Sequence, residues 1–265
     1  MIQLMQGDCM ELLKEVPDNS INMILCDLPY EETGNQWDNV LDMKELFNHY
    51  RRILVEDGCI ALTGTMKFGM QMYSVAPDLY KYEWVWEKDN GTNVPNIHYQ
   101  PFRVHEYIFI FGKGRVTNGN RTPMKYYPQM TQGTPYQQTS GRISDNWKGS
   151  LGNIVTSNES GQRFPKSIQK FNRDKTSFHP TQKPVAMLEY LIRTYTDEGD
   201  TVLDNCMGSG STGVACKNLN RNFIGMELTE KYFNIAKQRV EQGDKSILAE
   251  RAMEEKLKSC SQPLF

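Results

Sequence analysis

A glycine-rich turn between two strand-like segments constrains this chain most. The apolar run 201–204 leads into Asp-Asn-Cys-Met-Gly-Ser-Gly-Ser-Thr-Gly over residues 204–213, after which helical spacing begins. A second apolar run, 222–227, ends in Glu227. A strand, a glycine turn, a helix and a strand that ends in an acid are typical of a nucleotide-binding βαβ unit. The pattern therefore predicts an α/β fold in which a ligand meets the backbone of the turn.

The acid before the glycines distinguishes between possible ligands. The spacing Gly-x-Gly-x-x-Gly fits a dinucleotide cofactor, and it also fits a tight structural connection with no ligand. Asp204 would repel a doubly negative pyrophosphate but attract the ammonium and sulfonium groups of S-adenosylmethionine. Glu227 is placed to accept hydrogen bonds from two ribose hydroxyls. We therefore expect S-adenosylmethionine as cofactor, and a nicotinamide-linked oxidoreductase is the competing interpretation.

A second signal, Asp27-Leu28-Pro29-Tyr30, follows the apolar run 21–26. Ligands of open α/β sheets bind at such carboxyl ends of strands. The Asp27 carboxylate and the Leu28 carbonyl could accept both hydrogens of an exocyclic base amine and favour its pyramidal, nucleophilic form. Pro29 restricts the turn, and Tyr30 offers a ring on which a flipped base can stack. The alternative is an ordinary strand-end turn with a capping aspartate.

Apolar periodicity over the rest of the chain alternates between the two regular structures. It predicts strands at 21–27, 58–63, 82–86 and 106–111, and helices at 41–54, 184–196 and 230–258. Strands separated by helices favour a mostly parallel sheet with helices on both faces.

Composition changes between Arg115 and Lys175, where Gly, Pro, Asn, Gln, Thr and Ser dominate without periodicity. Ten basic and three acidic residues give this segment a charge of +7, whereas the remainder of the chain carries −9. Aromatic side chains are interleaved at Tyr126, Tyr127, Tyr136, Trp147, Phe164 and Phe171. A disordered insert is one interpretation. A basic, aromatic-bearing insert that faces a polyanion is the interpretation we favour.

Whole-chain properties exclude several other classes. A net charge of −2 excludes a uniformly basic nucleic-acid coat. No apolar run reaches the ~18 residues of a membrane span, and the N-terminus lacks the pattern of a signal peptide. The six cysteines are scattered without Cys-x-x-Cys pairs, which favours free thiols over structural zinc. These properties predict a cytoplasmic protein with no membrane partner.

Taken together, the motifs resemble those of the β class of amino-group DNA methyltransferases. In that class the catalytic tetrapeptide comes first, the target-recognition region follows, and the cofactor motif comes last. Here the order is the 27–30 tetrapeptide, the basic insert, His-Pro-Thr-Gln-Lys-Pro over residues 179–184, and the 204–212 turn. The resemblance covers nearly the whole chain. It is strongest to the small stand-alone N6-adenine enzymes of phages and prophages, which implies a bacterial protein or a phage protein acting in the host cytoplasm.

The resemblance implies a Rossmann-like S-adenosylmethionine-dependent methyltransferase fold with an inserted region. Its catalytic half would span residues 1–113, the inserted DNA target-recognition region 114–178, and the cofactor-binding half with a C-terminal helix 179–265. Double-stranded DNA would be the partner. The oligomeric state stays open, and a homodimer is suggested only by analogy with relatives that often pair.

Residue by residue, the resemblance implies catalytic roles for Asp27, Leu28, Pro29 and Tyr30. The cofactor contacts that it implies are made by Asp8, Thr181, Lys183, Asp204, Cys206, Gly208, Gly210, Ser211, Thr212 and Glu227, and no metal is implied. Asp8 would lie near the cofactor adenine, or it would cap a helix over residues 10–13. Thr181 and Lys183 would meet the methionine carboxylate, although Lys183 could equally be solvated.

The implied reaction is transfer of a methyl group to the N6 amine of adenine in duplex DNA, after base flipping. Aspartate at position 27 favours adenine over cytosine, but an N4-cytosine enzyme stays open. An oxidoreductase and a non-catalytic DNA-binding module remain further alternatives. Two departures from the family pattern bear on activity. Leu28 stands where relatives commonly have proline, and Cys206 stands where an aromatic residue is usual. The recognition sequence cannot be inferred from the insert, because base contacts depend on loop geometry.

Overall fold

The computed structural model describes residues 1–29, 41–140 and 154–242. The chain divides into two compact units, one of Met1–Tyr127 with Ser167–Phe265 and one of Pro128–Lys166. The larger unit contains an eight-stranded sheet with the strand order β1-β12-β11-β2-β3-β5-β4-β10. Its strands are β1 (Ile2–Gln6), β2 (Ile21–Cys26), β3 (Leu54–Gly64), β4 (Tyr80–Thr92), β5 (Arg103–Phe111), β10 (Ile168–Phe171), β11 (Thr201–Asp204) and β12 (Asn222–Glu227). No helix in the described ranges is long and apolar enough to cross a membrane.

The sheet is mostly parallel. β1, β12, β11, β2 and β3 all run in one direction, and β10 runs parallel to β4 at the far edge. β5 runs antiparallel to both β3 and β4, because a short connection with only the 3₁₀ turn η2 (Val94–Asn96) joins β4 to β5 in place of a helix. Periodicity did not predict β1 or β10. The predicted α/β fold with a mostly parallel sheet is nevertheless confirmed.

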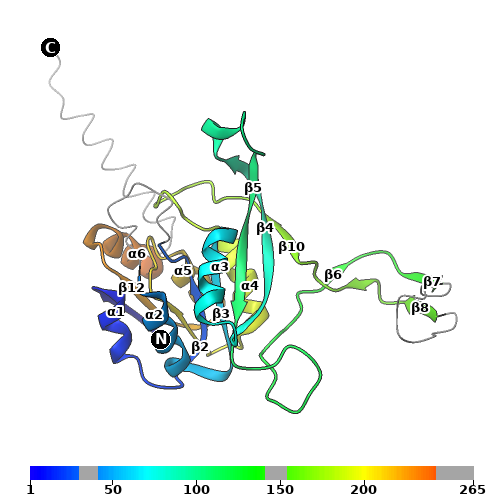
Figure 1. Cartoon of the computed structure of the whole chain (residues 1–265), viewed down its shortest axis with the longest axis horizontal. Coiled ribbons are helices and arrows are strands. Elements are labelled where there is room, and N and C mark those ends of the chain that lie inside the picture. The colour runs from blue at the N-terminus through cyan, green and yellow to red at the C-terminus, as the bar shows by residue number, and fades with distance from the viewer. Residues whose placement is uncertain (30–40, 141–153, 243–265) are drawn as a thin grey trace. The chain divides into compact units, whose positions relative to one another are not determined.

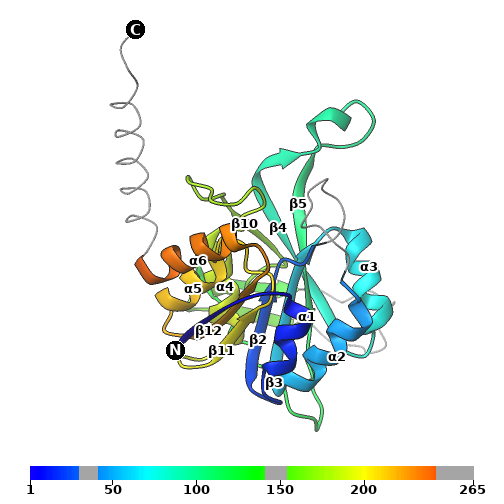
Figure 2. The same cartoon turned by 90° about the vertical axis from the view of Figure 1, so that its left-hand side faces the viewer.

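Helices cover both faces of the sheet (Figures 1 and 2). They are α1 (Cys9–Leu12) with the 3₁₀ turn η1 (Leu13–Glu15), α2 (Met43–Ile53), α3 (Met66–Val75), α4 (Val185–Tyr195), α5 (Ser211–Asn218) and α6 (Glu230–Gln242). Successive side chains of a strand point to opposite faces, so β2 serves both layers. Its Ile24 and Cys26 pack with α1, α2 and α3, whereas Met23 and Leu25 pack with α4, α5 and α6.

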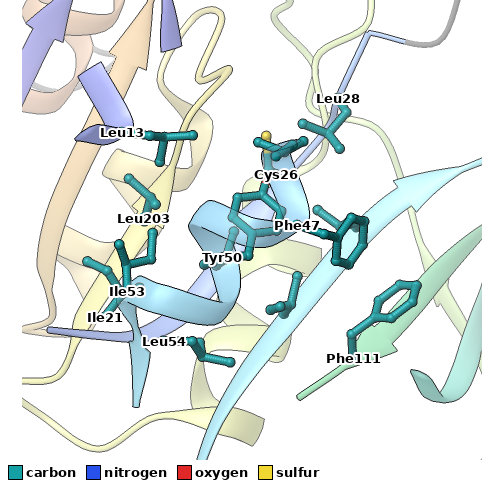
Figure 3. Close-up of a cluster of buried hydrophobic side chains, with 14 of the residues drawn as sticks. Leu13, Ile21, Cys26, Leu28, Phe47, Tyr50, Ile53, Leu54, Phe111 and Leu203 are labelled. Atoms are coloured by element: carbon teal, nitrogen blue, oxygen red, sulfur yellow. The ribbon is translucent and has the colours of Figure 1, made fainter. Parts of the chain in front are cut away.

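The first of these two cores is dominated by α2 (Figure 3). Asp42 caps this helix by accepting hydrogen bonds from the backbone N–H groups of Lys44 and Glu45, at 2.9 and 3.0 Å. The buried side chains of α2 recur every three or four residues, at Leu46, Phe47, Tyr50 and Ile53. They lie against β2, β3 and β5 and fix the carboxyl end of β2 from one side.

Strand connections diverge between the neighbours β2 and β11. From β2 the chain passes through α2 to β3 on one side, and from β11 it passes through α5 to β12 on the other. The two helices cover opposite faces, so neither blocks the carboxyl ends of β2 and β11. Such a topological switch point is where open α/β sheets bind their ligands.

The smaller unit is a two-stranded ribbon. β6 (Thr131–Gln132) pairs with β9 (Gln162–Arg163), and β7 (Tyr136–Ser140) pairs with β8 (Ile154–Asn158), both antiparallel. The Arg163 guanidinium lies 4.6 Å from the centre of the Tyr136 ring. This unit falls inside the predicted 114–178 insert, although the composition there predicted no strands. Residues on either side of the unit, including β10, belong to the larger one.

Candidate active site

A cavity of about 390 Å³ lies at the topological switch point. Every strand of the five-stranded parallel stretch contributes residues from its carboxyl end. These are Gly7 to Met10 after β1, Cys26 to Pro29 at the end of β2, Thr63 of β3, Asp204 to Ser209 at the end of β11, and Glu227 to Thr229 at the end of β12. The volume is that of a small-molecule site.

Most of the predicted site residues meet in this cavity although they are far apart in the chain. It is lined by Asp8, Asp27, Leu28, Pro29, Thr181, Lys183, Asp204, Cys206, Gly208, Ser211, Thr212 and Glu227. Gly210 is described by the structure but is not among the lining residues. Tyr30 lies outside the described residues, so the structure does not place its ring.

Glu227 is tied to the glycine turn. Its two carboxylate oxygens accept hydrogen bonds from the backbone N–H groups of Gly208 and Thr229, at 3.0 and 2.8 Å. Burial raises the pKa of Glu227, and these hydrogen bonds oppose the rise. Gly208 has a φ of +52°, which lets its N–H point back at the carboxylate. The acid is thereby fixed at the tip of β12.

Gly210 lies where the start of α5 packs against α6. It is the N-cap of α5 and has a φ of +78°. A Cβ atom there would lie 2.9 Å from the Cβ of Ala236 and 3.0 Å from its Cα, in helix α6. The absence of a side chain at Gly210 therefore allows α6 to pack closely, and the predicted contact of Gly210 with the cofactor stays a prediction.

Asp204 is buried at the end of β11. The Thr212 hydroxyl donates to one carboxylate oxygen at 2.6 Å, and the backbone N–H of Cys206 donates to the other at 3.1 Å. Burial raises the pKa of Asp204 to about 6, and the two hydrogen bonds limit the rise. The carboxylate thus holds the turn to the start of α5.

Arg239 of α6 holds the turn from behind and was not predicted. Its guanidinium is fully buried and donates to the Ser209 carbonyl at 2.8 Å, to the Ser209 hydroxyl at 2.9 Å and to the Ser211 hydroxyl at 3.1 Å. It also lies 4.6 Å from the centre of the Phe178 ring. In the sequence Arg239 is one cation of a charged helix, and nothing local marks it as buried.

Three thiols form part of the cavity wall, namely those of Cys9, Cys26 and Cys206. Cys206 occupies the position where an aromatic residue was expected. Burial raises the pKa of Cys26 to about 12, so this thiol stays protonated and acts as an apolar group. Within the described ranges, no group of His, Cys, Asp and Glu side chains is arranged to hold a metal ion.

Asp27, after β2, lies between two donors. The Thr63 hydroxyl donates to one carboxylate oxygen, and the Lys183 ammonium lies 2.5 Å from the other. Burial raises the pKa of Asp27, and the Lys183 charge opposes the rise. The Lys183 ammonium is also 3.5 Å from a carboxylate oxygen of Glu106. Leu28, which stands where relatives commonly have proline, packs into the first core and is almost fully buried.

Asp8 caps a helix, which was one of its two predicted roles, and its position near a cofactor adenine stays a prediction. Its carboxylate accepts a hydrogen bond from the backbone N–H of Met10 at 2.8 Å and so caps α1. It also lines the cavity. The capping contact orients the side chain beside the space that a ligand would occupy.

Several lining residues were not predicted. His179 precedes Thr181, whose hydroxyl lies 3.0 Å from the His179 Nδ1, and the imidazole packs edge-on against Tyr232 at 4.3 Å. Burial lowers the pKa of His179 to about 4, so the ring is neutral at pH 7. Asn205 accepts a hydrogen bond from the buried Tyr50 hydroxyl at 2.7 Å. The His-Pro-Thr-Gln-Lys-Pro motif could have indicated His179, whereas no sequence signal marks Tyr232.

The charges of the lining residues discriminate between ligand classes. Among the described residues that line the cavity, the carboxylates of Asp8, Asp27, Asp42, Asp204 and Glu227 outnumber the cations, of which Lys183 is one. Such a cavity disfavours a pyrophosphate and suits a ligand that carries ammonium and sulfonium groups. This excess of negative charge therefore fits S-adenosylmethionine and argues against a dinucleotide.

One acidic cavity contains a glycine turn, an acid placed to bind a ribose, and an Asp-Leu-Pro turn. Together with the fold, these features define the class of this protein as an α/β methyltransferase. Residues 21–238 match the DNA methylase family N6_N4_Mtase, and the chain belongs to that family. It is an amino-group methyltransferase of DNA.

Two relatives cover most of the chain. The type II methyltransferase M.HpaI of Haemophilus parainfluenzae is 28% identical over 99% of this chain and 80% of its own length. The type II methyltransferase M2.DpnII of Streptococcus pneumoniae is 27% identical over 90% of this chain and 89% of its own.

Solved structures share the fold. The crystal structure of an M1.HpyAVI–SAM complex has a TM-score of 0.60 and 26% identity, and the match covers 90% of this chain and 100% of that one. The cytosine-N4-specific PvuII DNA methyltransferase has a TM-score of 0.62 and 15% identity, over 92% of this chain and 87% of that one. At that identity the second likeness concerns the fold alone.

Proposed function

We propose that this protein transfers a methyl group to the N6 amine of adenine in duplex DNA. One observation carries the proposal: the Asp27 turn at the end of β2 and the glycine turn at the end of β11 face the same cavity. A donor held by one turn and an acceptor held by the other would meet there without any movement of the sheet. Membership of the DNA methylase family argues against the oxidoreductase alternative.

S-adenosylmethionine is the methyl donor. When bound, it supplies an activated methyl group whose sulfur is already a leaving group. We assign Glu227 to the ribose hydroxyls, and Asp8 to the neighbourhood of the adenine. The turn that carries Asp204, Cys206, Gly208, Ser211 and Thr212 would enclose the remainder of the donor. Thr181 would meet the methionine carboxylate, whereas the Lys183 ammonium is already shared between Asp27 and Glu106.

On the acceptor side, Asp27 and the Leu28 carbonyl would accept the two hydrogens of the target amine. The lone pair of that amine is delocalised into the base, and two acceptors favour the pyramidal form in which it is nucleophilic. Thr63 and Lys183 already donate to Asp27. An ionised carboxylate offers about four acceptor sites, so Asp27 can still accept a hydrogen bond from the target amine. Asp27 would also stabilise the positive charge that develops on the nitrogen.

Pro29 and Tyr30 complete the acceptor side of the proposal. Pro29 lines the cavity and fixes the turn, and Tyr30 would stack on the flipped base. The assignment to adenine rests on aspartate at position 27 and on the resemblance to N6-adenine enzymes. The same geometry would also serve the N4 amine of cytosine.

Nucleoside analysis tests the proposal directly. The protein is expressed in a methylation-deficient host, the genomic DNA is digested, and methylated nucleosides are measured by mass spectrometry. We expect N6-methyladenine, and we expect an Asp27→Ala variant to lose at least ~100-fold of the methylation while retaining its affinity for S-adenosylmethionine. N4-methylcytosine would overturn the choice of base, and an active Asp27→Ala variant would remove Asp27 from the mechanism.

DNA target recognition is assigned to the 114–178 insert, whose aromatic and basic side chains suit a polyanion. The ribbon of residues 128–166 supplies the regular part of this segment. Sequencing of the modified DNA from the same host would define the recognition sequence. The β-class assignment and the phage-type origin stay predictions from the resemblance, and the homodimer stays a prediction by analogy with such relatives.

A further inference from the structure

Behind the Asp27 turn, four charged side chains of alternating sign lie in a row. Lys88 of β4 pairs with Glu106 of β5, Glu106 lies 3.5 Å from Lys183, and Lys183 lies 2.5 Å from Asp27. Their side chains are between 6% and 21% exposed. The row therefore runs from the far strands of the sheet to the carboxylate that we propose accepts the target amine.

Both ends of the row are anchored by neutral groups. The Thr63 hydroxyl donates to Asp27 at one end. At the other end the Lys88 ammonium lies 5.3 Å from the centre of the Trp86 ring, and the Trp86 indole donates to the Phe171 carbonyl at 2.9 Å. Buried charges are costly unless they are paired, so two cations and two anions in alternation form a compensated set.

The Glu106–Lys183 contact is longer than the other two contacts in the row. The Glu106 oxygen nearest Lys183 is buried and, among the described residues, has no hydrogen bond of good geometry. Its contact with Lys183, at 3.5 Å, is weaker and longer than the 2.5 Å contact between Lys183 and Asp27. Glu106 attracts the Lys183 ammonium, but the ammonium stays closer to Asp27.

We propose that Glu106 and Lys88 are positioning residues that hold the Lys183 ammonium between two carboxylates and so set how strongly Asp27 accepts the target amine. The inference rests on the proposed role of Asp27. It adds a function for a strand pair on the antiparallel side of the sheet, outside both motifs.

The electrostatic logic gives a signed expectation. Charged or titratable groups that face Asp27 in the described part of the chain are Lys183, Glu106, Asp204 and Cys26. Lys183 lowers the pKa of Asp27 and Glu106 raises it. Removing the Glu106 charge should therefore lower the pKa of Asp27, because repulsion is lost and Lys183 turns fully to Asp27. Removing the Lys88 charge should raise it, because Glu106 then competes more strongly for Lys183.

Single-turnover methyl transfer to unmodified genomic DNA, followed from pH 4.5 to 8 with saturating S-adenosylmethionine, measures this balance. For Glu106→Gln we expect the acidic limb of the rate profile to shift to lower pH by roughly half to one unit. We also expect the rate on the plateau to fall roughly tenfold, because Asp27 becomes a weaker acceptor. For Lys88→Met the acidic limb should shift to higher pH.

The double variant Lys88→Met with Glu106→Gln should return the limb most of the way to the wild-type position. This variant contains no unpaired buried charge, so it keeps the inference testable if Lys88→Met alone does not fold. Glu87→Gln is the matched control. Glu87 is on the same strand as Lys88 but forms an exposed ion pair with Lys170 at 3.1 Å. It should change neither the limb nor the rate.

Shifts of the same sign in the two single variants, or no shift in Glu106→Gln, would show that the pair is merely structural and would overturn the inference alone. A wild-type protein that methylates neither adenine nor cytosine in the same assay would overturn the proposed function, and the inference with it.

Discussion

Asp204 is an acid whose surroundings oppose its charge. The residue is 4% exposed, and hydrogen bonds from the Thr212 hydroxyl, the Cys26 thiol and the Cys206 N–H compensate only part of the lost water. Its pKa is therefore about 6 in the folded chain, against an ordinary value of 3.8. A carboxyl with a raised pKa in the native state binds its proton more tightly there than in the unfolded state. The resulting stability is present below about pH 4 and is lost as the pH rises towards about 6.

Replacing Asp204 by asparagine should remove this titration while keeping a hydrogen-bonding amide of similar shape. Relative to the wild type, we expect Asp204→Asn to gain about 2 kcal/mol in free energy of unfolding between pH 4.5 and 7.5. Urea unfolding of both proteins at the two pH values, without cofactor, measures the difference. A difference independent of pH would mean that the Asp204 carboxyl titrates alike in the folded and unfolded chain.

At the scale of elements, the start of α5 shows two glycines of one motif in unlike roles. Gly210 faces α6, where a Cβ atom would meet the Ala236 backbone. Gly208 faces the cavity, and the nearest atoms to a Cβ there belong to the His179 ring at 3.7 Å. Both have a positive φ, so the backbone cost of alanine is similar and the difference lies in what the added carbon touches.

The two alanine variants should therefore separate stability from binding. Gly210→Ala is expected to cost about 2–4 kcal/mol in free energy of unfolding, because α6 must move. The folded fraction should keep its affinity for S-adenosylmethionine. Gly208→Ala is expected to cost only about 1 kcal/mol of stability but to weaken S-adenosylmethionine binding, since its methyl group enters the cavity.

Thermal unfolding and isothermal titration of each variant provide the two readouts. If Gly210→Ala weakened binding as much as Gly208→Ala at equal folded fraction, the assignment of Gly210 to helix packing would be wrong.

For the molecule as a whole, the structure changes how the basic segment is interpreted. Several of its cations are already paired with acids of the larger unit: Lys125 with Asp197 and Asp200, Lys170 with Glu87, and Arg173 with Asp89. The net charge of the segment in the sequence therefore overstates the charge that it offers to DNA. Cations such as the exposed Lys175 are the better candidates for phosphate contacts.

Salt dependence of DNA binding distinguishes the two kinds of lysine. Each phosphate contact contributes a slope of about −0.9 to the plot of log K against log salt concentration. Lys175→Ala should flatten the slope by about one contact and weaken binding to all sequences alike. Lys125→Met, the control, should leave the slope unchanged, because two aspartates already neutralise that ammonium at 2.9 and 2.6 Å.

Fluorescence anisotropy with an unmodified duplex over a series of salt concentrations measures both slopes. Equal slopes for Lys175→Ala and the wild type would place the DNA path away from Lys175.

Short-range patterns in the chain were enough to predict its class and most of the cavity. A short continuous apolar run, a glycine turn and an acid after a strand are requirements of local geometry, so they are visible in neighbouring residues. This is why the two turns, Glu227 and the α/β fold could be predicted. The single substitution of Cys206 for an aromatic residue was also visible, but not the three-thiol wall that it joins.

Contacts between distant segments were decided only by tertiary structure. β11 lies between β12 and β2, and Lys183 reaches Asp27 across 156 positions, because both arrangements follow from burying the two faces of the sheet. The same holds for Arg239 beneath the glycine turn and for Gly210 against Ala236. Local dihedral preferences and periodicity carry no information on which strand or helix becomes a neighbour. The packing of apolar faces selects those neighbours, and it thereby decides which charges meet in the site.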